Sequence, residues 1–163
     1  MHISKCFIIF VPESIRNKDM NMTQAHNSIR YYCIKKNIEV VPSNVWSYDH
    51  TERIITEVWR GTPTKSWIYT MLHELGHALN RSKKSFSYRS WKLSELGESI
   101  TSDKVATVQI MREEIEAWET GLKIAKKLMI DIDRKDYDKY ASNCLMRYMR
   151  ELPKQYDMMK TRK

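Results

Sequence analysis

Residues 68–79 read IYTMLHELGHAL, so two histidines, His73 and His77, lie four positions apart with Glu74 between them. On an α-helix, side chains four positions apart project to the same side, and the two imidazoles can bind one zinc ion. The glutamate that follows the first histidine can then act as a base on a water bound to that metal. This stretch therefore predicts a zinc site on a helix, with the chemistry of peptide-bond hydrolysis.

The flanking sequence predicts a helix that runs from residue 63 to residue 80. Thr62 suits the N-cap, and Pro63 suits the first helical position, where its missing N–H does no harm. His73 and His77 lie about 40° apart around this helix, opposite a broad apolar stripe. The stripe comprises Ile68, Met71, Leu72, Leu75, Ala78 and Leu79, with Trp67 at its edge. We expect the stripe to face the core and the histidines to face a different space.

The two histidines also have a plainer interpretation, as solvent-facing residues of a surface helix. Their spacing, with Glu74 between them and an apolar stripe behind them, favours the zinc site. Gly76 lies beside the histidines and leaves room for another backbone or a substrate to approach.

A catalytic zinc site usually has three protein ligands and one open position, so a third ligand is needed. The other histidines, His2, His26 and His50, all precede the motif, and none has a flanking pattern typical of a ligand. The sequence after His77 also lacks the further histidine of the metzincin motif. We therefore expect a carboxylate from a second helix.

A second long helix is predicted over residues 103–130, with Ser102 and Asp103 as candidate caps. Its apolar stripe comprises Ile110, Ala117, Trp118, Ala125 and Leu128, flanked by Leu122, Ile124 and Met129. Such a stripe predicts that one side of this helix packs into the protein.

The glutamates of this helix fall on different sides of it. Glu114 lies near the middle of the apolar stripe, where an unpaired carboxylate is costly. A zinc ion would be its partner, which makes Glu114 the expected third ligand; a buried ion pair with a Lys or Arg is the alternative. Glu116 and Glu119 fall on the polar side and Glu113 near the edge. Glu116, and then Glu113, are the replacement candidates for the third ligand.

Two segments together resemble a known family. The run LHELGHAL at residues 72–79, followed by the pattern Glu114-x-Glu116-Ala117-Trp118-x-x-Gly121, resembles the gluzincin type of zinc metallopeptidase. The similarity is greatest to the small ImmA/IrrE-like group, whose second motif reads roughly E-x-E-A-N-x-x-A. Trp118 departs from that pattern, since the relatives have an Asp or Asn there that hydrogen-bonds a zinc-binding histidine. The Met-rich, Gly-poor composition also resembles that of phage-encoded proteins.

The resemblance implies a zincin-like fold, Zn²⁺ as the cofactor, and a protein or peptide substrate. It implies that His73, His77 and Glu114 bind the metal and that Glu74 is the catalytic base. It further implies that a strand just upstream of the zinc helix, here residues 53–59, offers its edge to an extended substrate. An ordinary sheet strand is the alternative. A Tyr or His should stabilise the oxyanion, and the candidates are Tyr69, Tyr88, Tyr137, Tyr140, Tyr148 and His50.

Length and composition predict one α+β domain over residues 1–163, with a small mixed or antiparallel sheet packed on the zinc-binding helix. Its expected parts are a mixed strand and helix region (1–61), the active-site helix (62–80), a loop (81–102), C-terminal helices (103–152) and a basic tail (153–163). Expected elements are strands at 6–11, 38–41, 45–48 and 53–59, a helix at 22–36, a short helix near 94–96, and a last helix from its Asp133 cap to Leu152, ended by Pro153.

The net charge of +8 opens a second hypothesis. Basic clusters at residues 83–84, 126–127 and 160–163 can contact nucleic acid or an acidic protein. The alternative function is thus a non-catalytic, zinc-containing basic interaction module. No helix-turn-helix or RNA-binding signature accompanies the clusters, and an intact Glu74 favours the enzyme, because a non-catalytic zinc site has no use for that base.

Cysteine usage and hydropathy favour a cytoplasmic protein. Cys6, Cys33 and Cys144 are far apart and odd in number, so no disulfide framework is implied. The apolar run at residues 6–11 is too short to span a membrane and lacks a signal-peptide cleavage pattern, which favours a buried strand.

Overall fold

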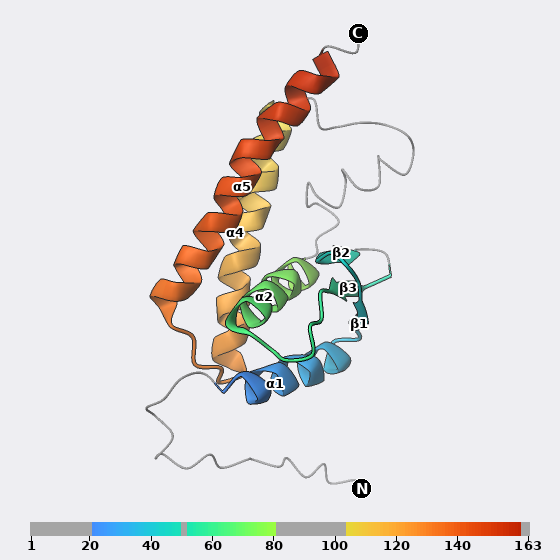
Figure 1. Cartoon of the computed structure of the whole chain (residues 1–163), viewed down its shortest axis with the longest axis vertical. Helices are drawn as coiled ribbons and strands as arrows, with labels where there is room; N and C mark the ends of the chain where they lie inside the picture. The colour runs from blue at the N-terminus through green and yellow to red at the C-terminus, as the bar shows by residue number, and fades with distance from the viewer. Residues whose placement is uncertain (1–20, 50–51, 81–103, 161–163) are drawn as a thin grey trace, which may run out of the picture.

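The computed structural model describes residues 21–49, 52–80 and 104–160 (Figure 1). In these residues the chain forms four helices and one three-stranded sheet. The elements are α1 (Met22–Lys35), β1 (Glu39–Pro42), β2 (Ser47–Asp49), β3 (Ile54–Glu57), α2 (Lys65–Leu79), α4 (Lys104–Lys127) and α5 (Arg134–Lys160). The predicted α+β class with a small mixed sheet is confirmed. The predicted strand at 6–11 and the loop at 81–102 with its short helix lie outside the described residues.

The sheet has the strand order β1-β3-β2, with β1 parallel and β2 antiparallel to β3. Ile55 and Glu57 of β3 are buried and alternate with partly exposed residues, as the period-two pattern predicts. However, the expectation that an extended substrate pairs with the edge of this strand is wrong. Both edges of β3 are already hydrogen-bonded, to β1 and to β2.

A buried carboxylate links the sheet to two helices. The side chain of Glu57 is 1% exposed and forms a 2.9 Å ion pair with Arg30 of α1. Its other oxygen accepts a 3.2 Å hydrogen bond from the indole N–H of Trp67 at the start of α2. Because a buried carboxylate needs such partners, this cluster fixes β3 against α1 and α2.

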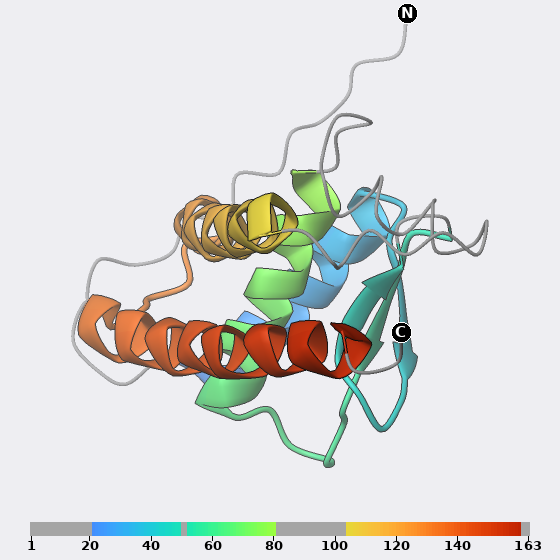
Figure 2. The same cartoon turned by 90° about the horizontal axis from the view of Figure 1, so that it is seen from above.

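Helix α2 lies between the sheet and α1 on one side and α4 on the other (Figures 1 and 2). It begins two residues later than expected, because Thr64 rather than Thr62 is the N-cap and its hydroxyl accepts a 3.1 Å hydrogen bond from the Trp67 N–H. The predicted apolar stripe is confirmed, since its members are buried except for the half-buried Leu79. On the histidine side of α2, which α4 covers, His73 and Glu74 are buried and His77 is half-buried.

Helix α4 ends at Lys127, where the residues after it close the helix by backbone hydrogen bonds. The Ile130 N–H donates to the Ala125 carbonyl at 2.9 Å, and Met129 adopts a positive φ of 55°. Met129, expected to flank the apolar stripe of this helix, lies after its end and is 78% exposed.

Helix α5 begins as expected, with the Asp133 carboxylate accepting a 3.0 Å hydrogen bond from the Asp136 N–H. The prediction that Pro153 ends this helix and opens a frayed tail is wrong, because α5 continues to Lys160. A proline removes one backbone donor, and the hydrogen bonds on either side can carry a helix past it at some cost. In the described segments, no helix combines the length and the apolar character needed to cross a membrane.

Candidate metal centre

The site is built where α2 and α4 cross at close range. A β-carbon at Gly76 would overlap the carbonyl oxygen of Ala117 and lie 2.7 Å from its carbonyl carbon. A β-carbon at Gly121 would lie 2.8 Å from the carbonyl oxygen of Leu72. Each helix therefore presents a glycine to the backbone of the other, and of the two expectations for Gly76, approach by another backbone is the one seen.

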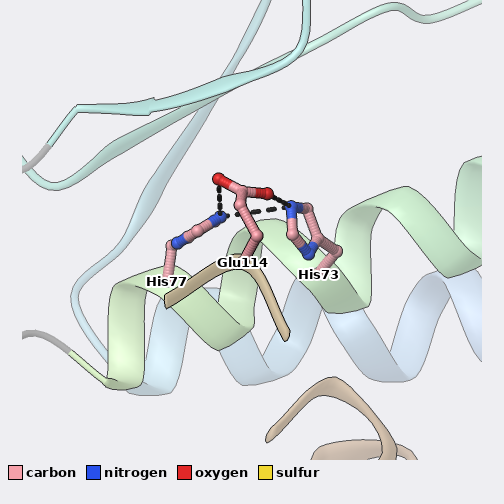
Figure 3. Close-up of side chains that lie close together, drawn as sticks. All are labelled: His73, His77 and Glu114. Carbon is pink, nitrogen blue, oxygen red and sulfur yellow. Dashed lines mark hydrogen bonds and ion pairs between the residues drawn. The ribbon is translucent and has the colours of Figure 1, made fainter. Parts of the chain in front are cut away.

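This crossing brings Glu114 over the two histidines of α2 (Figure 3). The Nε2 atoms of His73 and His77 lie 3.1 Å apart. The carboxylate oxygens of Glu114 lie 3.1 Å from His73 Nε2 and 3.4 Å from His77 Nε2. Two ligand atoms about 2.0–2.1 Å from a tetrahedral zinc ion are themselves roughly 3.3 Å apart. The 3.1 Å between the two Nε2 atoms is close to this value, and one ligand atom from each of the three residues lies within 4.8 Å of the others, so the group can hold one metal ion.

Burial and mutual contact shift the pKa values of these groups. Burial raises the pKa of Glu114, but hydrogen bonds from His73 and His77 outweigh it and lower this pKa to about 2. Burial lowers the pKa of His73, and the hydrogen bond to Glu114 only partly opposes it. Burial also acts to lower the pKa of His77, yet contact with Glu114 raises it overall. Glu114 is therefore a carboxylate at neutral pH, as a metal ligand must be.

Glu74 is buried beside this group. It is 7% exposed, and the charges of His77 and Glu114 both act on it. Burial raises the pKa of Glu74 to about 7, with His77 opposing and Glu114 adding to the shift. A carboxyl group with a pKa near neutrality is suited to accept and release a proton.

The glutamates of α4 lie as the helical wheel predicts. Glu114 is buried, Glu113 is half-buried, and Glu116 and Glu119 are exposed. Of the four, only Glu114 joins a group that can hold a metal among the described residues. Its ion-pair partners in the described segments are the two histidines, and no Lys or Arg pairs with it there.

The described tyrosines proposed as oxyanion donors are engaged elsewhere or lie in the core. The hydroxyl of Tyr137 donates to the Trp118 carbonyl at 3.0 Å, and burial raises the pKa of Tyr137. The hydroxyl of Tyr140 is hydrogen-bonded to that of Thr70 at 3.0 Å, one helical turn before His73. Tyr69 is 3% exposed and packs edge-on against the Tyr137 ring. Tyr88, His50 and the side chain of Tyr148 lie outside the described parts.

His26 lies away from the metal centre, as expected of a histidine without a ligand pattern. Its ring packs between Trp59 and Trp67, with centroid distances of 4.9 and 4.7 Å. His2 lies outside the described residues. Of the basic clusters, only residues 126 and 127 have described side chains, and the ammonium of Lys127 lies 5.8 Å from the centre of the Tyr32 ring.

Two contributions to the site were missed from the sequence. The ring of Trp118 stacks on His73 with a centroid distance of 4.2 Å and an interplanar angle of 22°. Gly121 allows the close approach of α2 and of the Tyr137 hydroxyl. Trp118 and Gly121 lie four and seven residues after Glu114, so all three share one face of α4. That shared face was the sequence signal that could have placed them at the site.

Comparisons with protein-family models, with curated proteins and with solved structures found no match for this chain. The resemblance to gluzincins therefore rests on the motif residues of this sequence alone. What the site can do is inferred from its own residues and their arrangement.

Proposed function

We propose that this protein is a zinc-dependent metallopeptidase of gluzincin type that hydrolyses peptide bonds in a protein or peptide. The observation that carries the proposal is the convergence of His73 Nε2, His77 Nε2 and the Glu114 carboxylate into a group compact enough to hold one metal ion, with Glu74 buried beside them. Two imidazoles and one carboxylate are a typical ligand set of catalytic zinc.

The number of ligands favours a catalytic over a structural site. Structural zinc is normally enclosed by four protein ligands, most often with cysteine among them. In the described part of the chain the group has three members and no cysteine. A fourth coordination position would then be open to water and substrate.

Each residue has a defined role in this proposal. His73, His77 and Glu114 would hold the metal, which when bound lowers the pKa of a coordinated water and polarises the substrate carbonyl. Glu74 takes a proton from the attacking water and delivers it to the leaving amine. Its buried position next to the histidines suits this transfer, because burial raises the pKa of Glu74 to about 7, where it can both accept and release a proton.

The test compares the full chain with Glu74→Gln, which keeps the side chain's size but removes its basicity. Both proteins are loaded with zinc and incubated with a mixed-sequence peptide library, and new termini are counted by mass spectrometry. We expect cleavage by the wild type, a loss of at least about 100-fold in Glu74→Gln, and equal zinc content in both. Equal cleavage by the two proteins would contradict the role of Glu74.

A zinc-loaded wild type that cleaves nothing would contradict the peptidase proposal. The alternative would then be the basic interaction module, which binds nucleic acid or an acidic protein. Binding to a duplex DNA that weakens steeply with added salt would identify phosphate contacts as its basis.

A further inference from the structure

His73 uses only one of its ring nitrogens in the metal centre. Its Nδ1 atom is buried and has no hydrogen-bond partner among the described residues. A neutral imidazole that binds a metal through Nε2 carries its proton on Nδ1, which makes Nδ1 a donor. Metal-binding histidines usually donate this proton to a carboxylate, a carbonyl or water, and the hydrogen bond fixes the ring. In the described part of the chain, no such contact fixes His73.

The flat face of Trp118 contacts the His73 ring instead. The two rings are stacked at 4.2 Å and 22°, and Trp118 is 5% exposed. The indole Nε1–H is only a donor, and it too has no partner among the described residues. Trp118 therefore cannot accept the proton of Nδ1. Its contribution to His73 is the contact of the two ring faces.

Trp118 is itself held from the side of α5. Tyr137 and Tyr140 meet the indole nearly edge-on, with centroid distances of 5.5 and 5.9 Å. The Tyr137 hydroxyl donates to the Trp118 carbonyl at 3.0 Å. Gly121 permits this approach, because a β-carbon there would lie 2.6 Å from that hydroxyl. The indole thus contacts His73 and both tyrosines of α5.

We propose that Trp118 is the positioning residue of the metal centre. Its indole face holds the imidazole of His73 so that Nε2 faces the other ligands, in place of a hydrogen bond to Nδ1, for which the described residues offer no partner. This role rests on the proposed metal centre. It also gives α5 a part in the site, since the tyrosines of α5 fix the indole that fixes the ligand.

The test measures metal affinity rather than activity. Co²⁺ and Zn²⁺ are titrated into the full chain in competition with a chelator, and the visible spectrum of bound Co²⁺ reports the ligand geometry. Trp118→Phe keeps a flat ring and should bind within about three-fold of the wild type. Trp118→Leu keeps apolar bulk without a flat face and should bind roughly 10- to 100-fold more weakly, with an altered Co²⁺ spectrum.

A matched control separates positioning from simple loss of stability. Ile124→Ala removes buried apolar bulk from the same helix, so it should lower the melting temperature while leaving the affinity and the Co²⁺ spectrum unchanged. If Trp118→Leu does not fold, Trp118→Met provides unbranched bulk without a flat face, and the same loss of affinity is expected.

The outcomes distinguish the two proposals. Wild-type affinity in a folded Trp118→Leu or Trp118→Met overturns the positioning role but leaves the metal centre intact. If Ile124→Ala weakens metal binding as much as Trp118→Leu does, the positioning role is also overturned, because metal affinity would then follow stability alone. A wild type that binds neither metal overturns the metal centre and the positioning role together.

Discussion

The backbone of Gly76 lies so close to the carbonyl of Ala117 that no side chain fits between them. This contact sets the distance between α2 and α4, and Glu114 lies one turn of α4 before Ala117. Because His73 and His77 flank Gly76 on α2, the same contact brings the carboxylate over the imidazoles. The glycine between Glu74 and His77 thus has a packing role, since its contact with α4 places the third ligand beside the two histidines.

Replacing this glycine should damage both the fold and the site. Gly76→Ala puts a methyl group into the Ala117 backbone, so the two helices must separate, at a cost of about 1–3 kcal/mol or more in the free energy of unfolding. Thermal unfolding and zinc titration should show a lower melting temperature and weaker zinc binding. Lys123→Ala, on the exposed side of α4, is the control and should change stability by less than about 0.5 kcal/mol. Gly76→Ala with wild-type stability would show that α2 and α4 are not held this closely.

The buried thiol of Cys33 predicts a loss of stability in alkali. Burial raises the pKa of Cys33 to about 12 from an ordinary 9.0, with Arg30 partly opposing the shift. Between these values the unfolded chain loses the thiol proton while the folded protein keeps it, so the unfolded state gains stability as the pH rises. The free energy of unfolding should fall by up to about 1.4 kcal/mol per pH unit from this group.

Urea unfolding at pH 8 and pH 10.5 measures this effect. In Cys33→Ala, the free energy of unfolding should fall less between the two pH values than it does in the wild type. Cys144→Ala should reduce the loss less than Cys33→Ala does, because Cys144 is only half-buried, although burial raises the pKa of its thiol as well. If the free energy of unfolding falls equally in Cys33→Ala and in the wild type, the Cys33 thiol ionises equally in the folded and unfolded states.

The sequence was most informative where hydrophobic periodicity and burial act together. The helix expected at 22–36 corresponds to α1, and the apolar stripe predicted over 103–130 correctly identified Glu114 as the buried glutamate of α4. A carboxylate in the middle of an apolar face is costly, so its position alone implies a partner. Burial of Glu114 and its proximity to the two histidines followed from this argument.

Features that depend on tertiary contacts were not predictable in the same way. Thr62 and Thr64 are equally good caps by residue type, and only the backbone path decides that Thr64 accepts the hydrogen bond. The alternating pattern at residues 53–59 predicts which face of the strand is buried but not which strands pair with it. The central place of β3 in the sheet was therefore missed. Stacking of Trp118 on His73 depends on how closely α2 and α4 cross, and that distance is set by two glycines.

The most direct test of the metal centre is the zinc content of the untagged protein, measured by elemental mass spectrometry alongside His77→Ala and Glu114→Gln. His77→Ala removes one imidazole, and Glu114→Gln keeps the size of the third side chain while removing its charge. About one zinc per wild-type chain, lost or greatly reduced in both variants, is the predicted result. Zinc retained in Glu114→Gln but lost in His77→Ala would contradict Glu114 as the third ligand, and a wild type that takes up no zinc even when it is added would contradict the metal centre itself.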